Sequence, residues 1–235
     1  FLNVYNNIDI SCNLSITFGI VIMKKKILTS FIIAGLLAVE SFMFSPVFSA
    51  EKLTRKQKKE IALINVAVAS FDAGQYDLAI EYYTKAIAVN PENAESYAKR
   101  GNAEFLSGNY KNAVTDYTKA LELDPSRENL YYNRGIARAN MQEYDSVVED
   151  YTKELEINPQ NANAYLNRGT ARVVLKQYDE AIEDFTHVIE LERDNVLAYY
   201  NRGIAYRNKG EYKKAIEDYT KVIELDGKNI EAYNN

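Results

Sequence analysis

The sequence predicts an all-α fold, an α-solenoid made of tandem helix-turn-helix units. A five-residue stretch, Tyr131 to Gly135, returns almost unchanged at residues 97–101, 165–169 and 199–203. The glycines that end these copies lie 34 residues apart. Apolar residues around them recur at spacings of three, four and seven, the period of one face of a helix. Repeats of this length bury their apolar faces only by stacking on their neighbours.

The repeat aligns with itself without gaps. In every unit a small residue or valine is followed four positions later by an aromatic residue, as in Ala113 and Tyr117, so both lie on one helical face. Each unit is expected to form two helices of about 14 residues, which are marginal alone in water and need the stack. The five units cover residues 60–93, 94–127, 128–161, 162–195 and 196–229.

A glycine marks the turn between the two helices of a unit. Gly74, Gly108 and Gly210 occupy this place, where a helix end in the left-handed conformation suits glycine. Gln142 and Lys176 stand there in the third and fourth units and are expected to tolerate it less well. A proline ends the second helix in the first three units.

This pattern resembles the tetratricopeptide-repeat family. The resemblance rests on an aromatic, glycine, alanine, aromatic, alanine and proline at the family's positions: Tyr97, Gly101, Ala113, Tyr117, Ala120 and Pro125. It covers residues 60–229 and implies a right-handed superhelix whose inner groove binds proteins. Val147 and Glu154 depart from the small residues expected in their columns, which puts local helix packing in the third unit in doubt.

Ahead of the repeats, Met23 opens a pattern of its own. Three lysines, an apolar run from Ile27 to Val39 and a short polar segment describe a secretory signal peptide over residues 23–50. Cleavage after Ser49 or Ala50 predicts an exported protein, periplasmic or secreted. The alternative is an uncleaved membrane anchor, although the apolar run is short for a bilayer.

The two ends of the chain carry further expectations. Residues 1–22 precede the natural start and are interpreted as a spurious extension, and residues 51–59 as a basic lead-in. The single cysteine, Cys12, lies in that extension, so the mature chain would depend on packing for stability. Residues 230–235 begin a truncated sixth unit. Since an open solenoid end exposes apolar surface, the chain is expected to be a fragment or to dock at this end.

Arginine and aspartate recur together in the repeat. They occupy the seventh and twenty-third positions of four units, and the first unit replaces both, by Val66 and Tyr82. Two antiparallel helices would bring these positions level, so we expect bidentate ion pairs between the helices of each unit. The predicted structural pairs are Arg100 with Asp116, Arg134 with Asp150, Arg168 with Asp184, and Arg202 with Asp218.

An amide-rich column precedes the arginines. Helix propensity does not explain asparagine inside a helix, and an amide both donates and accepts, so it can pair with the backbone of any extended peptide. The resemblance implies that this column lines the inner groove and holds a peptide main chain. The alternative is that these residues cap or bridge neighbouring helices. The column consists of Asn65, Lys99, Asn133, Asn167 and Asn201.

Other groove positions implied by the resemblance differ from unit to unit, as specificity residues should. Tyrosine, phenylalanine and arginine among them are types that dominate interface energies. The alternative is that some of these aromatic residues pack between units. The predicted partner-binding residues here are Asn102, Phe105, Tyr132, Tyr200 and Arg207.

No pattern in the sequence indicates catalysis, a metal or a cofactor. The single histidine, His187, occupies a column otherwise filled by lysine, and no phosphate loop or nucleophile motif is present. A net charge of −5 argues against nucleic acid as a partner.

The predicted function is that of a non-catalytic adaptor, a scaffold that binds a protein or an extended peptide in its groove. One alternative is a structural cell-envelope component that self-associates through its open C-terminal end. Another is the binding arm of a larger enzyme.

Overall fold

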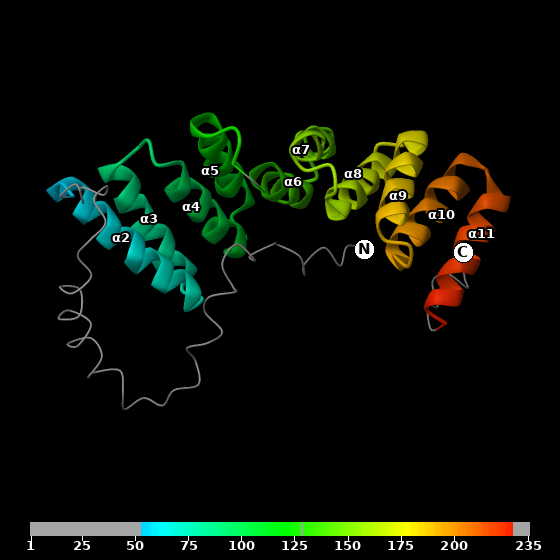
Figure 1. Ribbon diagram of the computed structural model, residues 1–235, viewed down its shortest axis with the longest axis horizontal. Coiled ribbons are helices and arrows are strands. Elements are labelled where there is room, and N and C mark those ends of the chain that lie inside the picture. The colour runs from blue at the N-terminus through cyan, green and yellow to red at the C-terminus, as the bar shows by residue number, and fades with distance from the viewer. Residues whose placement is uncertain (1–52, 128, 228–235) are drawn as a thin grey trace, which may run out of the picture. The chain divides into compact units, whose positions relative to one another are not determined.

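A computed structural model describes residues 53–127 and 129–227 of the chain. This part contains ten helices and no strand, and they succeed one another along the chain (Figure 1). The helices are α2 (Arg55–Asp72), α3 (Tyr76–Val89), α4 (Ala94–Leu106), α5 (Tyr110–Leu123), α6 (Leu130–Asn140), α7 (Tyr144–Ile157), α8 (Ala162–Val174), α9 (Tyr178–Leu191), α10 (Val196–Lys209) and α11 (Tyr212–Leu225). Each helix packs mainly on the helices before and after it in sequence. The predicted solenoid of tandem helical hairpins is confirmed.

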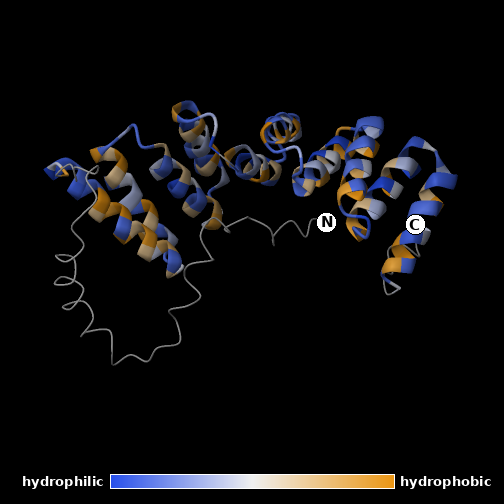
Figure 2. Cartoon of the chain, viewed as in Figure 1, coloured by the Kyte–Doolittle hydropathy of each residue, from blue (hydrophilic) through white to orange (hydrophobic). Residues whose placement is uncertain are grey.

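The core of each hairpin is the small-residue column packed with the aromatic column. Phe185 and Ala181 are both fully buried. Figure 2 shows hydrophobic and hydrophilic residues interspersed along the helices. Glycine at the eighth position of a unit allows the close approach of the aromatic ring. A Cβ atom built on Gly169 would lie 2.7 Å from Cε1 of Phe185, too close for any side chain.

The turns inside the units have the left-handed backbone that the sequence predicts. Gly108 has φ +80°, and no atom lies near the place of a Cβ there. Gln142 and Lys176 adopt the same conformation, with φ angles of 61° and 62°, and therefore carry the strain that glycine avoids.

Asparagines begin the first helix of three units. Asn93, Asn161 and Asn195 each accept a hydrogen bond on the side-chain oxygen from a backbone N–H three residues later. The third unit differs, because Asn129 adopts a left-handed φ of 64° and makes no side-chain cap, and the helix that follows, α6, has 11 residues.

The third unit also accommodates its unusual acidic residue. Glu154 is 2% exposed, and its Oε1 accepts a hydrogen bond of 3.0 Å from Nδ2 of Asn161. Val147, in the small-residue column, is 1% exposed. Both departures from the family pattern are thus absorbed into the packed interior.

At the start of the stack, α2 begins at Arg55, so most of the predicted basic lead-in belongs to the first helix. The predicted signal segment, the upstream extension and the sixth unit lie outside the described residues. Among the described helices, none combines the length and apolar character needed to cross a bilayer.

Candidate functional site

The structure brings together all four arginine–aspartate pairs expected from the sequence. Each guanidinium, from the first helix of a unit, donates through Nε and Nη2 to the carboxylate from the second helix. The Nη2–Oδ1 distances are 2.7 Å for Arg100 and Asp116, 2.6 Å for Arg134 and Asp150, 2.7 Å for Arg168 and Asp184, and 2.7 Å for Arg202 and Asp218. The aspartates are 1–5% exposed.

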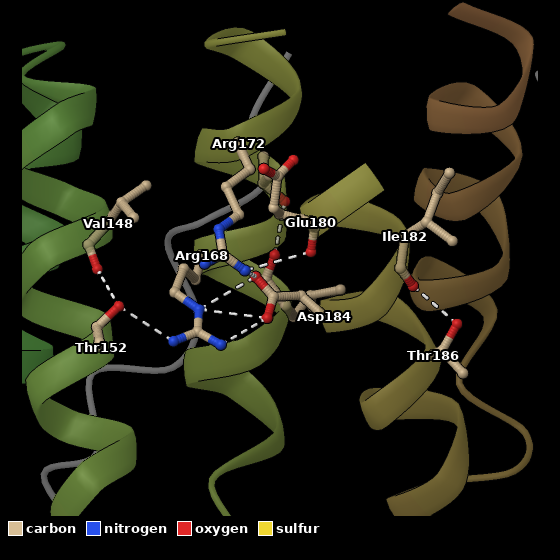
Figure 3. A network of polar contacts seen from close by, with 10 residues as sticks. Val148, Thr152, Arg168, Arg172, Glu180, Ile182, Asp184 and Thr186 are labelled. Atoms are coloured by element: carbon tan, nitrogen blue, oxygen red, sulfur yellow. Dashed lines mark hydrogen bonds and ion pairs between the residues drawn. The ribbon is translucent and has the colours of Figure 1, made fainter. Parts of the chain in front are cut away.

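The same arginines also join neighbouring units. Nη1 of Arg168 donates to Oγ1 of Thr152 in the preceding unit at 3.1 Å (Figure 3). Thr152 Oγ1 in turn donates to the backbone oxygen of Val148 at 2.7 Å. Equivalent bonds of 3.0 Å run from Arg100 to Thr84, Arg134 to Thr118 and Arg202 to Thr186. Each arginine therefore fixes the two helices of its own unit and the unit before it.

Two further arginines, which the sequence analysis missed, strengthen the middle of the stack. Nη1 of Arg138 lies 2.9 Å from Oδ2 of Asp150, and Nη1 of Arg172 lies 2.7 Å from Oδ2 of Asp184. Figure 3 shows Arg168 and Arg172 on one helix, both directed at Asp184. Their spacing of four residues was the signal, because residues four apart share a helical face.

Burial and charge act in opposite directions on these carboxylates. Burial raises the pKa of Asp150, and the hydrogen bonds and charges of Arg134 and Arg138 oppose that rise without cancelling it. Burial likewise raises the pKa of Asp116. The hydrogen bonds that Arg100 donates to Asp116 raise the pKa of that guanidinium in return. The pairs therefore hold the helices together and leave little charge for a partner.

Some side chains of the asparagine column are hydrogen-bonded within the chain and others are exposed. The column consists of Asn65, Lys99, Asn133, Asn167 and Asn201. Nδ2 of Asn167 donates to Oη of Tyr132 at 3.3 Å, and Nδ2 of Asn133 lies 3.5 Å from Oδ1 of Asn102. Asn65 is exposed, and Asn201 is partly exposed. Nζ of Lys99 lies 3.9 Å from the Glu95 carboxylate, one turn away on the same helix.

Asn133 has an unusual environment within this column. The residue is 8% exposed, and its Oδ1 is buried without a hydrogen-bond partner among the described residues. A buried polar atom left unpaired costs about 1–3 kcal/mol. The acceptor therefore lies within the packed stack and costs stability there.

Two of the predicted partner-binding residues lie inside the stack. Tyr132 is 5% exposed and packs on Tyr151 with ring centroids 5.6 Å apart. Phe105 is 7% exposed and packs on Tyr110 at 5.3 Å. Aromatic rings gain more from this packing than from exposure to water, and little of either ring is left for a partner.

The other three predicted partner-binding residues are partly exposed. Tyr200 lies 5.9 Å from Tyr219 between ring centroids, and Arg207 is half-buried. Asn102 accepts a hydrogen bond of 2.8 Å from Oη of Tyr117. All three retain some exposed surface, and Asn102 lies beside Asn133 of the asparagine column.

His187 also differs from the lysines of its column, because its ring packs edge-on against Tyr165 at 5.0 Å. Within the described part of the chain, no group of three or more His, Cys, Asp or Glu side chains is placed to hold a metal ion.

Family models match most of the repeat region. A model described as "Tetratricopeptide repeat" matches residues 61–93 and 196–229. A second, "TPR repeat", matches residues 101–142 and 171–210, and a third, "Tetratricopeptide repeat", matches residues 151–183. No curated protein matches the sequence.

Solved structures share the fold. A crystal structure of MamA protein superimposes with a TM-score of 0.70 at 24% identity, covering 74% of this chain and 95% of that one. A crystal structure of YrrB, described as "a TPR protein with an unusual peptide-binding site", superimposes with a TM-score of 0.70 at 24% identity, covering 74% of this chain and 90% of that one. A MamA structure from Desulfovibrio magneticus RS-1 superimposes with a TM-score of 0.68 at 23% identity, covering 73% of this chain and 97% of that one.

Proposed function

We propose that this chain, which belongs to the tetratricopeptide-repeat family, is a non-catalytic scaffold that binds an extended protein segment along its asparagine column. The observation that carries the proposal is the recurrence of an amide at one position of successive first helices, where Asn65 is exposed and Asn167 and Asn201 are partly exposed. An extended peptide presents a backbone N–H and C=O at every residue, and an amide side chain matches both.

The column favours main-chain recognition. Asn133 and Asn167 belong to successive units, and their side chains are held by Asn102 and Tyr132 respectively. A held side chain loses little entropy when a ligand binds. Amides that recur at the same position of successive units can pair with the backbone of one peptide regardless of its sequence.

Sequence preference would come from the residues beside the column. Tyr200 and Arg207 are partly exposed and supply an aromatic face and a cation in the last unit. Lys99, where the column lacks an asparagine, adds a second cation in the second unit. We therefore expect the bound segment to carry acidic residues near both cations.

The test begins with peptides selected on the immobilised chain from a random displayed library. Affinity for an enriched, labelled peptide is then measured by fluorescence anisotropy. Replacing Asn133, Asn167 and Asn201 together by alanine should weaken binding by tenfold or more, since each lost hydrogen bond is worth about 0.5–1.5 kcal/mol. The melting temperature should change little.

A matched control removes three amides elsewhere. Asn109, Gln160 and Gln177 are exposed residues in turns, and their triple alanine variant should bind the peptide normally. Unchanged affinity in the column variant would refute the proposal. Loss of helical signal in that variant would instead assign the column a structural role.

We also propose that the chain is exported. The support is the sequence of residues 23–50 alone, with its lysines, apolar run and small residues at the end. Expression in a bacterial host followed by N-terminal sequencing of the periplasmic fraction should give a new terminus at Ala50 or Glu51. A chain that keeps residues 23–50 and stays with the membrane would contradict cleavage.

A further inference from the structure

The second unit carries an acidic residue where the next two units carry a cation. The eleventh position holds Arg138 in the third unit and Arg172 in the fourth, and each pairs with the aspartate of its own unit, at 2.9 and 2.7 Å. In the second unit the same position holds Glu104. The buried polar group between α4 and α5 therefore combines two carboxylates, those of Glu104 and Asp116, with the guanidinium of Arg100.

Both of these carboxylates are removed from water. Glu104 is 7% exposed and Asp116 is 3% exposed. Asp116 has strong partners, because Nε and Nη2 of Arg100 donate to its two oxygens at 2.8 and 2.7 Å. The Glu104 carboxylate is held more weakly, since its hydrogen-bond donor among the described residues is Nδ2 of Asn112 at 3.3 Å. A buried carboxylate without a cation of its own is costly, and binding a proton removes that cost.

In the described part of the chain, the helices around this group bring no second cation to it. Arg100, on α4, is the positive charge that acts on both carboxylates. From α3, Thr84 contributes a neutral hydroxyl that accepts from Nη1 of Arg100 at 3.0 Å. From α6, Arg134 is directed at Thr118 and at Asp150 of its own unit. The group therefore has an excess of one negative charge when both carboxylates are ionised.

This excess charge affects how the group binds protons, because nearby like charges disfavour ionisation. Burial, and to a smaller extent the charge of Glu104, raises the pKa of the Asp116 carboxyl, and Arg100 offsets only part of that rise. The folded chain therefore binds a proton here more tightly than the unfolded chain does. The resulting stabilisation is complete below the ordinary aspartate pKa of about 3.9, and it is lost as pH rises through the raised folded-state pKa.

We propose that Glu104 and Asp116 form an acid-responsive pair, which takes up one proton as pH falls and thereby strengthens the packing of α4 on α5. The proton removes the excess negative charge and leaves one carboxylate for Arg100, as in an ordinary ion pair of the stack. Because α4 also carries Lys99 and Asn102, mild acid would hold those two residues more firmly in place. The third and fourth units have an arginine at the position of Glu104, so they have no excess negative charge to neutralise.

Carbon-13 NMR of the side-chain carboxyl groups tests the pair on the full chain. The Asp116 signal is assigned by its loss in Asp116→Asn, and its titration midpoint is then measured in the wild type and in Glu104→Gln. Glutamine keeps the shape of Glu104 and can still accept a hydrogen bond from Asn112, so the fold should be preserved. Removal of the second negative charge should lower the Asp116 midpoint by about half a pH unit or more, because a nearby like charge disfavours ionisation.

Two further variants separate the charge of Glu104 from its packing. Glu122→Gln removes an exposed carboxylate from α5 and should leave the Asp116 titration midpoint unchanged. Glu104→Arg introduces the cation found at the eleventh position of the third and fourth units, and it should lower the Asp116 midpoint further than Glu104→Gln does.

Urea unfolding gives a second measurement. Glu104→Gln should unfold at a higher urea concentration than the wild type at about pH 7.5, where the wild type has both carboxylates ionised. This difference should shrink as pH falls to about 4.5, because the wild-type pair then binds its proton.

Three outcomes would overturn the proposal. An Asp116 titration midpoint that is the same in the wild type and in Glu104→Gln would show that the two carboxylates do not share a proton. An equal shift of that midpoint in Glu122→Gln would assign the change to the overall charge of the chain. A difference in urea midpoint between Glu104→Gln and the wild type that stays constant with pH would assign Glu104 a packing role only.

Discussion

Replacement of Asp184 by asparagine should destabilise the stack more than the same change at Asp116. Asp184 is 2% exposed and accepts hydrogen bonds from Arg168 at 2.7 Å and from Arg172 at 2.7 Å. Asparagine keeps the shape but removes the charge and turns an N–H₂ group toward two guanidinium groups. Breaking a buried ion pair on one side costs about 3–5 kcal/mol.

Asp116 is the matched interior control. It is 3% exposed and receives a bidentate pair from Arg100 alone, because Glu104 stands where Arg172 stands in the fourth unit. Asp184→Asn should therefore cost more than Asp116→Asn by about 1.5–3 kcal/mol, the range for one hydrogen bond to a charged group.

Urea unfolding followed by circular dichroism at 222 nm measures both losses, provided that the m-value stays constant. Combining Asp184→Asn with Arg172→Leu should recover the difference, since the second guanidinium is no longer left unpaired. Equal costs for the two aspartates, or a cost of Asp184→Asn within about 0.5 kcal/mol of zero, the range of ordinary surface changes, would refute the reasoning.

Three further predictions concern the backbone, the interior and the response to pH. Lys176→Gly should raise the free energy of unfolding by about 0.5–1 kcal/mol in urea titration, because the left-handed φ of 62° strains lysine; a loss of stability would contradict this. Gly169→Ala should lower the free energy of unfolding by about 1–3 kcal/mol, since the new Cβ would lie 2.7 Å from Phe185. Gly227→Ala is its control, because the new Cβ there would meet only a backbone oxygen at 3.7 Å. Burial raises the pKa of Tyr117 and Tyr151, so the stability they contribute is complete below about pH 10 and is lost as pH rises further. The tyrosinate absorbance of these two buried rings should therefore appear only together with loss of helix above that pH, and full tyrosine titration before helix loss would exclude the burial.

Much of the fold could be predicted from the sequence because each unit repeats a local rule. The apolar spacing sets which face of a helix is buried, and the positions of Gly108 and Lys176 mark the turns. Arg168 and Asp184 could be paired on the same basis, since they change together between units and two antiparallel helices bring them level. These features depend on residues within one hairpin.

The candidate site was less predictable. Tyr132 and Phe105 belong to groove positions that vary between units, yet the structure buries them against Tyr151 and Tyr110. The direction in which an aromatic ring points depends on how the neighbouring helices pack. The spacing of residues along the sequence does not specify that packing. The ion pair between Arg172 and Asp184 was likewise not predicted. Its only sign in the sequence was that Arg172 lies four positions after Arg168.

By itself, the sequence determined the helical repeat, its register, its turns and its paired charges, because these follow from the period of apolar and charged residues along one chain segment. Only the tertiary structure decided how units meet: the link from Arg168 to Thr152 and the unpaired oxygen of Asn133. Whether a side chain is covered is set by the neighbouring unit, about 34 residues away in sequence, and its atoms must be placed before that contact can be known.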